Sequence, residues 1–302
     1  MIKPLFRRLL SRLIRRLLVR QRSAENLLRL LNDVDLRIRI SRSSVHALAK
    51  ELKTRIEFAD IGARGDLHPF AREFASVVNL KLFEPDAGEA ASLSDRLIMF
   101  PNVTVAPVAI GAHFTRQTLY VTRKPGGSSL LHPQGPMQKL IQRNHPDLSR
   151  FDVVETVEVS VVPLHSAVSK LDLLKIDTQG TALEVLEGLG SLRPLLIEVE
   201  VEMAEIYSGQ STLFEVGGLL RRLGYFLVEN RIHREPLGIA DNRGYRQVVQ
   251  ISGDVLFSPD LTAMGQSITR GREEEFRFLS SAYAIGDYAD WYLQNVEKPR
   301  VV

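Results

Sequence analysis

Asp60 and Glu84 stand where two neighbouring strands of a parallel sheet are expected to end, and an acid at such a place can hydrogen-bond the hydroxyls of a ribose. The segment 56–86 predicts a strand, a glycine turn, a helix and a second strand. Its turn contains Gly62, Ala63 and Gly65, and the glycines permit a backbone geometry and a close ligand approach that side chains obstruct. This pattern predicts a nucleotide-like ligand; the simpler alternative is a strand-to-helix turn that needs glycine.

Asp60 helps to identify the nucleotide-like ligand. A dinucleotide fingerprint has glycine at this position so that the chain can pass beneath a pyrophosphate, and a carboxylate there would repel phosphate. An acid suits a ligand that combines a ribose with a cationic amino acid end. S-adenosylmethionine is such a ligand, and the reading as an NAD-dependent oxidoreductase is disfavoured.

A second set of acids follows two later strands. Residues 171–188 predict a buried strand that ends at Asp177 and leads through a glycine into a helix, and residues 195–203 predict the next strand, which carries Glu200. Asp177 is the first candidate for accepting or orienting a proton of a substrate hydroxyl, and Glu200 is the second. The alternatives for Asp177 are a structural turn carboxylate and a cofactor contact.

Several blocks of the sequence, taken together and in this order, resemble the FkbM-type methyltransferase family. They are the glycine turn, KIDTQG, LEVLEGL, the long segment from IEVEVEM to GYFL, and GDVLF. The likeness spans about residues 54–259. It implies a Rossmann-like, class I methyltransferase fold, an α/β fold with a seven-stranded, mostly parallel sheet and an antiparallel last strand. It also implies S-adenosylmethionine as the cofactor and O-methylation of a hydroxyl on a sugar, glycolipid or secondary metabolite.

The resemblance adds site residues and one departure. Gly111, at the end of a third strand predicted over 103–110, is expected near the adenine, and Ser128 and Ser129 match a serine pair of the family and are expected near the substrate. Ala182 stands where relatives commonly have glutamate. That departure motivates an alternative function, a catalytically degenerate methyltransferase fold that acts as an interaction module at a membrane surface.

The chain divides into four predicted parts. Residues 1–22 form a basic amphipathic helix, 23–53 a helical cap or linker, 54–259 the methyltransferase domain, and 260–302 a helical extension with two short helices. The first part holds eight basic residues and no acid, so the rest of the chain is net acidic although the whole carries +3. Nucleic acid is therefore not an expected partner of the globular part.

The N-terminal helix leaves three readings open. It can lie on an anionic membrane surface, pack its leucines on the domain or a partner, or serve as an organelle-import presequence. Its apolar runs are too short for a membrane span. We expect a cytoplasmic protein, with peripheral attachment at the inner membrane surface as the membrane variant. The chain has no cysteine, and no histidine or acid spacing predicts a metal site.

Overall fold

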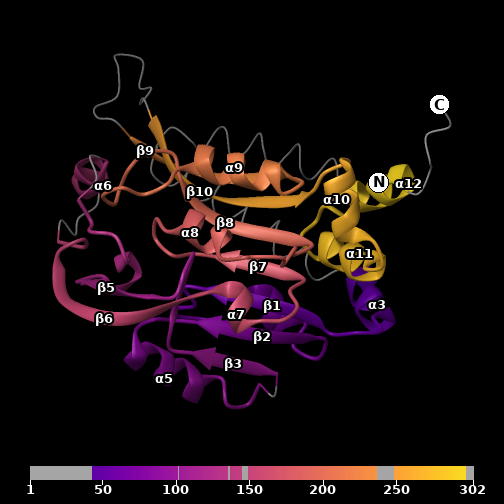
Figure 1. Ribbon diagram of the computed structural model, residues 1–302, viewed down its shortest axis with the longest axis horizontal. Helices are drawn as coiled ribbons and strands as arrows, with labels where there is room; N and C mark the ends of the chain where they lie inside the picture. The colour runs from indigo at the N-terminus through magenta and orange to yellow at the C-terminus, as the bar shows by residue number, and fades with distance from the viewer. Residues whose placement is uncertain (1–42, 101, 135–136, 145–148, 237–247, 297–302) are drawn as a thin grey trace, which may run out of the picture.

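A central sheet of seven strands organises the computed structural model, which describes residues 43–100, 102–134, 137–144, 149–236 and 248–296 (Figure 1). The strand order is β3-β2-β1-β7-β8-β10-β9, and β10 is antiparallel to both of its neighbours while the β3-to-β8 pairs are parallel. The strands are β1 Ile56–Ile61, β2 Val78–Phe83, β3 Val103–Ala106, β7 Leu173–Ile176, β8 Leu196–Glu202, β9 Tyr225–Pro236 and β10 Val248–Pro259. The predicted sheet is confirmed. The predicted helix over 1–22, and most of 23–53, lie outside the described residues.

A second, three-stranded sheet corrects one prediction. Residues 103–110 are not a single strand, because β3 ends at Ala106 and β4 (Ala109–Gly111) belongs to the other sheet, in the order β4-β6-β5. Pro107 stands between the two strands and has no N–H to donate to a ladder. The other members are β5 Thr115–Thr122 and β6 Val153–Pro163.

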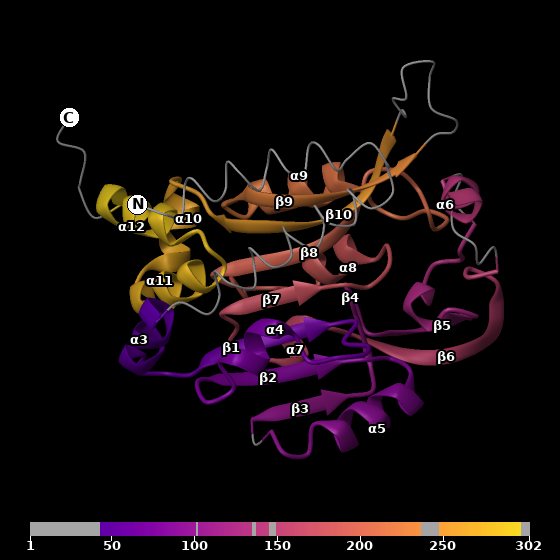
Figure 2. The ribbon, with the colours of Figure 1, turned by 180° about the vertical axis from the view of Figure 1, so that it is seen from behind.

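Helices cover both faces of the central sheet. Helices α8 (Ala182–Glu187) and α9 (Leu213–Arg222) contact β8 on the face seen in Figure 1, and α4 (Pro69–Glu73) lies on the opposite face (Figure 2). A capping box, in which Thr212 and Glu215 bond each other's backbone, fixes the start of α9. The other described helices before residue 260 are α3 Ser43–Glu51, α5 Ala87–Arg96, η1 Pro125–Gly127 (a 3₁₀ turn), α6 Gln138–Asn144 and α7 Leu164–Ala167.

The C-terminal extension holds three helices within 260–296, where two were predicted: α10 Ala263–Thr269, α11 Glu273–Ala282 and α12 Gly286–Val296. Phe278 of α11 packs at 5.1 Å against the ring of Phe74 and at 5.8 Å against Phe70, so the extension shares the core of the sheet. Arg272 donates a 2.7 Å hydrogen bond to the fully buried Asp172, which precedes β7. Burial of these side chains ties the extension to the sheet.

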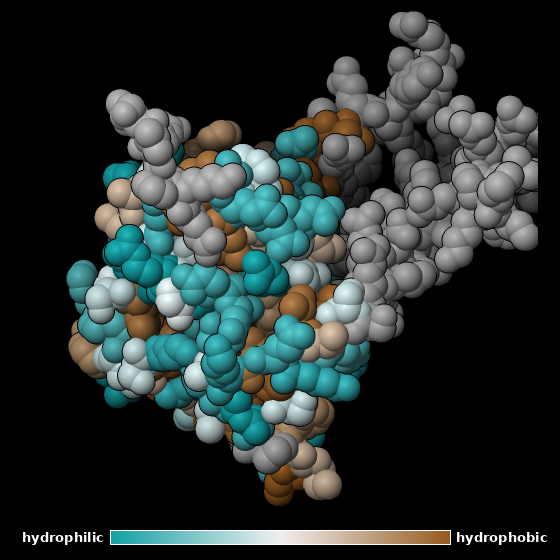
Figure 3. All heavy atoms as spheres, turned by 90° about the vertical axis from the view of Figure 1, so that its right-hand side faces the viewer, coloured by the Kyte–Doolittle hydropathy of each residue, from teal (hydrophilic) through white to brown (hydrophobic). Residues whose placement is uncertain are grey.

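The surface around these C-terminal helices is mostly hydrophilic, with scattered apolar residues (Figure 3). Among the described helices, none is both long enough and apolar enough to cross a bilayer.

Candidate functional site

The glycine turn after β1 brings three strand ends together. Gly62 has φ +79°, and a Cβ on it would lie 1.9 Å from the carbonyl oxygen of Asp177. The N–H groups of Gly62 and Ala63 both donate to the carbonyl of Phe83, at 2.9 and 3.1 Å. Only glycine fits at position 62, because a side chain there would collide with the chain that follows β7.

A cavity of about 180 Å³ opens beside this turn. It lies between the ends of β1, β2 and β7 on one side and β4 with the loop 125–130 on the other. Its walls include Gly62, Arg64, Glu84, Ile110, Leu119, Ser128, Ser129, Asp177, Thr178 and Gln179. These residues place a concave site at the carboxyl edge of the parallel strands, where ligands bind in open α/β sheets.

Glu84 is a buried carboxylate in the wall of this cavity. It is 3% exposed, accepts a 2.9 Å hydrogen bond from the N–H of Asp86, and lies 3.4 Å from the guanidinium of Arg64. Burial raises the pKa of Glu84, and those two donors offset part of the effect. Arg64 makes its shorter contact, 2.8 Å, with Asp86. The main partner of Arg64 is therefore Asp86, and its contact with Glu84 is the weaker of the two.

Asp177 carries a negative charge at the opposite end of the same cavity. Lys175 Nζ lies 3.2 Å from its Oδ2 and 3.3 Å from Oδ1 of Asp60, so one ammonium bridges two carboxylates. Burial disfavours the charge of Lys175, but the two acids raise its pKa above its ordinary value. Lys175 was not among the predicted site residues; the available signal was a lysine inside an otherwise apolar strand.

Glu200 is the uncharged partner of Asp177. The Nε2 atom of Gln179 donates to Glu200 at 2.6 Å and to Asp177 at 3.2 Å, and the Tyr207 hydroxyl lies 3.0 Å from Gln179 Oε1. Burial, then a hydrogen bond with Asp177 and repulsion from it, raises the pKa of Glu200 to about 10. For Asp177 burial acts in the same upward direction, but hydrogen bonds from Glu200, Lys175 and Gln179 lower its pKa. The pair thus holds one proton and one charge at neutral pH.

The remaining predicted residues lie at different distances from the cavity. Ser128 and Ser129 line it, but their hydroxyls are engaged: Ser128 accepts from the Thr122 N–H at 3.1 Å, and Ser129 donates to the Gln179 carbonyl at 2.7 Å. Gly111 pairs with Pro163 in the second sheet and lines an adjoining cavity.

Asp60, Ala63 and Gly65 are not among the residues that line the cavity. Asp60 is 4% exposed and faces Lys175, and burial raises its pKa against the opposing effect of that lysine. The cofactor contacts expected of these three residues stay predictions.

Comparison with known families explains the arrangement. The model of the methyltransferase FkbM domain matches residues 60–227, more than half of the chain. The chain belongs to the FkbM methyltransferase family. All the lining residues of the 180 Å³ cavity fall inside the matched segment. A search of curated proteins returned no significant match.

Solved methyltransferase structures resemble the chain at low identity. Methyltransferase FkbM from Methylobacillus flagellatus KT is 15% identical, with a TM-score of 0.39; the match covers 67% of this chain and 43% of that one. Precorrin-6y C5,15-methyltransferase from Geobacter metallireducens GS-15 is 11% identical, with a TM-score of 0.36 and coverages of 71% and 87%. Magnesium protoporphyrin IX methyltransferase from Synechocystis PCC 6803, with bound SAM, is 12% identical, with a TM-score of 0.35 and coverages of 74% and 79%. The family assignment rests on the match of the FkbM domain model to residues 60–227.

The cavity of the FkbM domain suits S-adenosylmethionine, the cofactor that membership of a methyltransferase family supports. Gly62 lets the turn pack directly against the chain after β7, and Asp177 of that segment lines the cavity, where its charge would complement an ammonium or sulfonium group. Glu84 lines the cavity beside the apolar walls of Ile110 and Leu119, and its predicted contact with ribose hydroxyls would be made there. The buried hydroxyl of Thr178 has no hydrogen-bond partner among the described residues, which leaves it for a ligand.

The start of α8 reflects the departure at Ala182. Thr181, the N-cap residue, makes no side-chain cap to the helix, and Ala182 is 5% exposed. No acid replaces the usual glutamate at this point, although Glu184 follows two residues later with one buried, unpartnered carboxylate oxygen.

Proposed function

We propose that the protein transfers a methyl group from S-adenosylmethionine to a hydroxyl oxygen of a small-molecule or glycan acceptor. The supporting observation is the pair formed by Asp177, which lines the cofactor cavity and is ionised, and Glu200, which lies behind it and keeps its proton. A hydroxyl needs an acceptor for its proton as the new C–O bond forms, and Asp177 supplies one.

The bound cofactor would supply an electrophilic methyl group on a sulfonium, whose sulfur leaves as a neutral thioether and needs no acid. The residues of the chain then have two tasks. Gly62, Thr178 and Glu84 hold the donor in one place, which converts a bimolecular reaction into a positioned one. Asp177 takes the hydroxyl proton, while Lys175 and Gln179 fix the orientation of its carboxylate.

The low pKa of Asp177 limits its strength as a base. A group is most effective when its pKa lies near the working pH, so Asp177 acts mainly by orienting the hydroxyl and relieving charge. Glu200 cannot take the proton below about pH 10 because it already carries one. The charge of Asp177 and its place in the cavity wall therefore favour it over the protonated Glu200 as the acceptor of the proton.

The test is transfer of a tritiated methyl group from S-adenosylmethionine to the glycolipid, polysaccharide and small-molecule fractions of a cell extract. We expect label in a product that resists mild alkali, because a methyl ether survives conditions that hydrolyse a methyl ester. Label only in alkali-labile or nucleic-acid fractions would contradict methylation of a hydroxyl on a small-molecule or glycan acceptor. No label in any fraction would favour the alternative, a degenerate interaction module, which the alanine at position 182 motivates.

The basic segment 1–22 supports a second part of the proposal, peripheral attachment to an anionic membrane. Such attachment would hold the enzyme beside lipid-linked acceptors at the inner membrane surface.

A further inference from the structure

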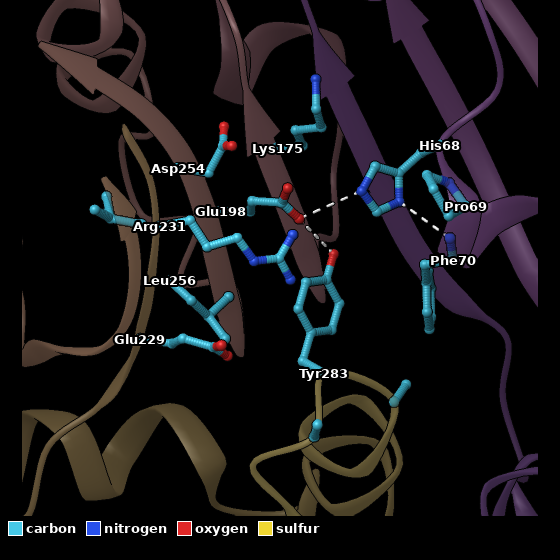
Figure 4. A pocket seen from close by; sticks show the side chains of 13 residues that line it. His68, Pro69, Phe70, Lys175, Glu198, Glu229, Arg231, Asp254, Leu256 and Tyr283 are labelled. Atoms are coloured by element: carbon cyan, nitrogen blue, oxygen red, sulfur yellow. Dashed lines mark hydrogen bonds and ion pairs between the residues drawn. The ribbon is translucent and has the colours of Figure 1, made fainter. Parts of the chain in front are cut away.

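A second cavity, of about 320 Å³, lies on the face of the sheet that carries α4 (Figure 4). Its walls come from the start of α4, the middle of β8, β10 and β9, and the turn between α11 and α12. None of these lining residues lines the cofactor cavity.

Glu198 is the fixed polar group of this second cavity. The ring nitrogen Nε2 of His68 lies 3.3 Å from Glu198 Oε2, and the hydroxyl of Tyr283 donates to the same oxygen at 2.8 Å (Figure 4). The other ring nitrogen of His68 accepts the N–H of Phe70, so the hydrogen is on Nε2. Glu198 Oε1 makes no hydrogen bond with the residues that the structure describes, and it is available to accept one from a ligand hydroxyl.

The charges around the cavity nearly cancel. Glu198, Glu229 and Asp254 oppose Arg231 and Lys175, and Figure 4 shows the guanidinium of Arg231 directed between Glu198 and Tyr283. Such a balance offers both donors and acceptors and favours neither a strong anion nor a strong cation.

Apolar surface completes the cavity. Phe70 and Leu256 line it together with the ring of Tyr283, which stacks on His68 at 15° and 6.5 Å. Apolar walls with a few convergent polar groups are typical of a small-molecule site. Carboxylates and a guanidinium above an aromatic and aliphatic floor match a ring that has hydroxyls on its rim and C–H groups on its face.

One end of this cavity approaches the proposed reaction centre. Lys175 lines the cavity, and its Nζ contacts Asp177. Asp254, which also lines it, stands opposite Glu200 in the β8–β10 register. The other walls, from β9, β10 and α11, lie beyond residue 227 and outside the family match.

We propose that this cavity binds the sugar ring of a neutral glycan acceptor, with Glu198 and Arg231 on its hydroxyls and its reacting hydroxyl directed toward Asp177. The inference rests on the proposed O-methyltransferase function and adds the place where the acceptor binds and the residues that hold its ring.

Saturation-transfer difference NMR tests the proposal, with the full chain and enough S-adenosylhomocysteine to fill the cofactor site. The probes are methyl hexosides and methyl 6-deoxyhexosides, with glucose 6-phosphate as an anionic control and choline as a cationic one. We expect transfer to at least one neutral glycoside and to neither control. Transfer to neither hexosides nor 6-deoxyhexosides, or to a charged control alone, would overturn the proposal.

Three variants locate the binding. Leu256→Trp fills the cavity and should abolish glycoside transfer, and Glu198→Gln should weaken glycoside binding at least ten-fold. Tyr283→Phe keeps the ring and removes one donor to Glu198, so it should weaken glycoside binding less than Glu198→Gln does. Because it changes only one hydroxyl, it still tests the cavity if the tryptophan variant misfolds. Glu155→Gln, an exposed change on β6, is the matched control and should leave binding unaltered.

Cofactor binding of the same proteins separates the two claims. Calorimetry with S-adenosylhomocysteine should give the wild-type affinity in all four variants. If the wild type itself fails to bind S-adenosylhomocysteine, the proposed function fails; if it binds but glycoside transfer persists in Leu256→Trp and Glu198→Gln, the sugar lies elsewhere and only the acceptor site is refuted.

Discussion

Glu202 offers a direct test of the low-dielectric environment along β8. It is 3% exposed, and burial, followed by repulsion from Asp177, raises its pKa from the ordinary 4.5 to about 7. The folded protein therefore binds more protons at this site than the unfolded chain does, and its stability falls as pH rises from 4.5 toward 7. The difference between 7 and 4.5, at about 1.4 kcal/mol per pKa unit, corresponds to about 3 kcal/mol of destabilisation above pH 7.

Glu202→Gln should remove that penalty because glutamine has the shape of the neutral acid. The free energy of unfolding of the variant, measured by urea denaturation, should gain on that of the wild type by about 2–3 kcal/mol between pH 5 and pH 8. Glu155→Gln, at an exposed position, should change the difference by less than about 0.5 kcal/mol over the same range. A Glu202→Gln difference that stays flat or shrinks with rising pH would refute the argument.

Three further predictions concern catalysis, fold stability and membrane attachment. Asp177→Asn should lower kcat by about 10²-fold or more, because it removes the carboxylate that orients the hydroxyl and takes its proton; radiolabelled methyl transfer measures this, and a loss under ten-fold would remove Asp177 from that role. Arg272→Leu should lower the free energy of unfolding by about 3 kcal/mol, because it removes the closer of the two cations beside the buried carboxylate of Asp172 and leaves only Lys170, at 3.5 Å. Arg277→Leu, which breaks an exposed pair with Asp290, should cost no more than about 1 kcal/mol; equal effects in urea denaturation would contradict this contrast. Deletion of residues 1–22 should reduce co-sedimentation with anionic vesicles and leave S-adenosylhomocysteine binding intact; undiminished sedimentation would end the membrane proposal.

The sequence predicted the elements that depend on local pattern. The unit from β1 to β2 could be found because buried strand, glycine turn and terminal acid follow one another within about thirty residues. Helix α9 has local signals of the same kind, because its capping box joins residues three apart in the sequence. Elements of this kind carry their own signals.

The features that were missed depend on how distant segments meet. Pro107 was a local sign that residues 103–110 do not form one strand, but the transfer of β4 to a second sheet depends on its pairing with β6, some fifty residues later. The second cavity joins His68, Glu198 and Tyr283, which are far apart in the chain. Likewise, the different protonation of Asp177 and Glu200 comes from burial and shared hydrogen bonds, which no spacing of acids reveals.

Calorimetric titration of the full chain with S-adenosylhomocysteine, alongside Gly62→Ala, tests the central claim most directly. A Cβ at position 62 would collide with the Asp177 carbonyl at 1.9 Å in a backbone conformation of φ +79°, so the variant should lose the shape of the cofactor cavity. We expect micromolar binding by the wild type, about −8 kcal/mol, and loss of that binding in the variant. No detectable binding by the wild type, or equal affinity in both proteins, would contradict a cofactor site at this turn.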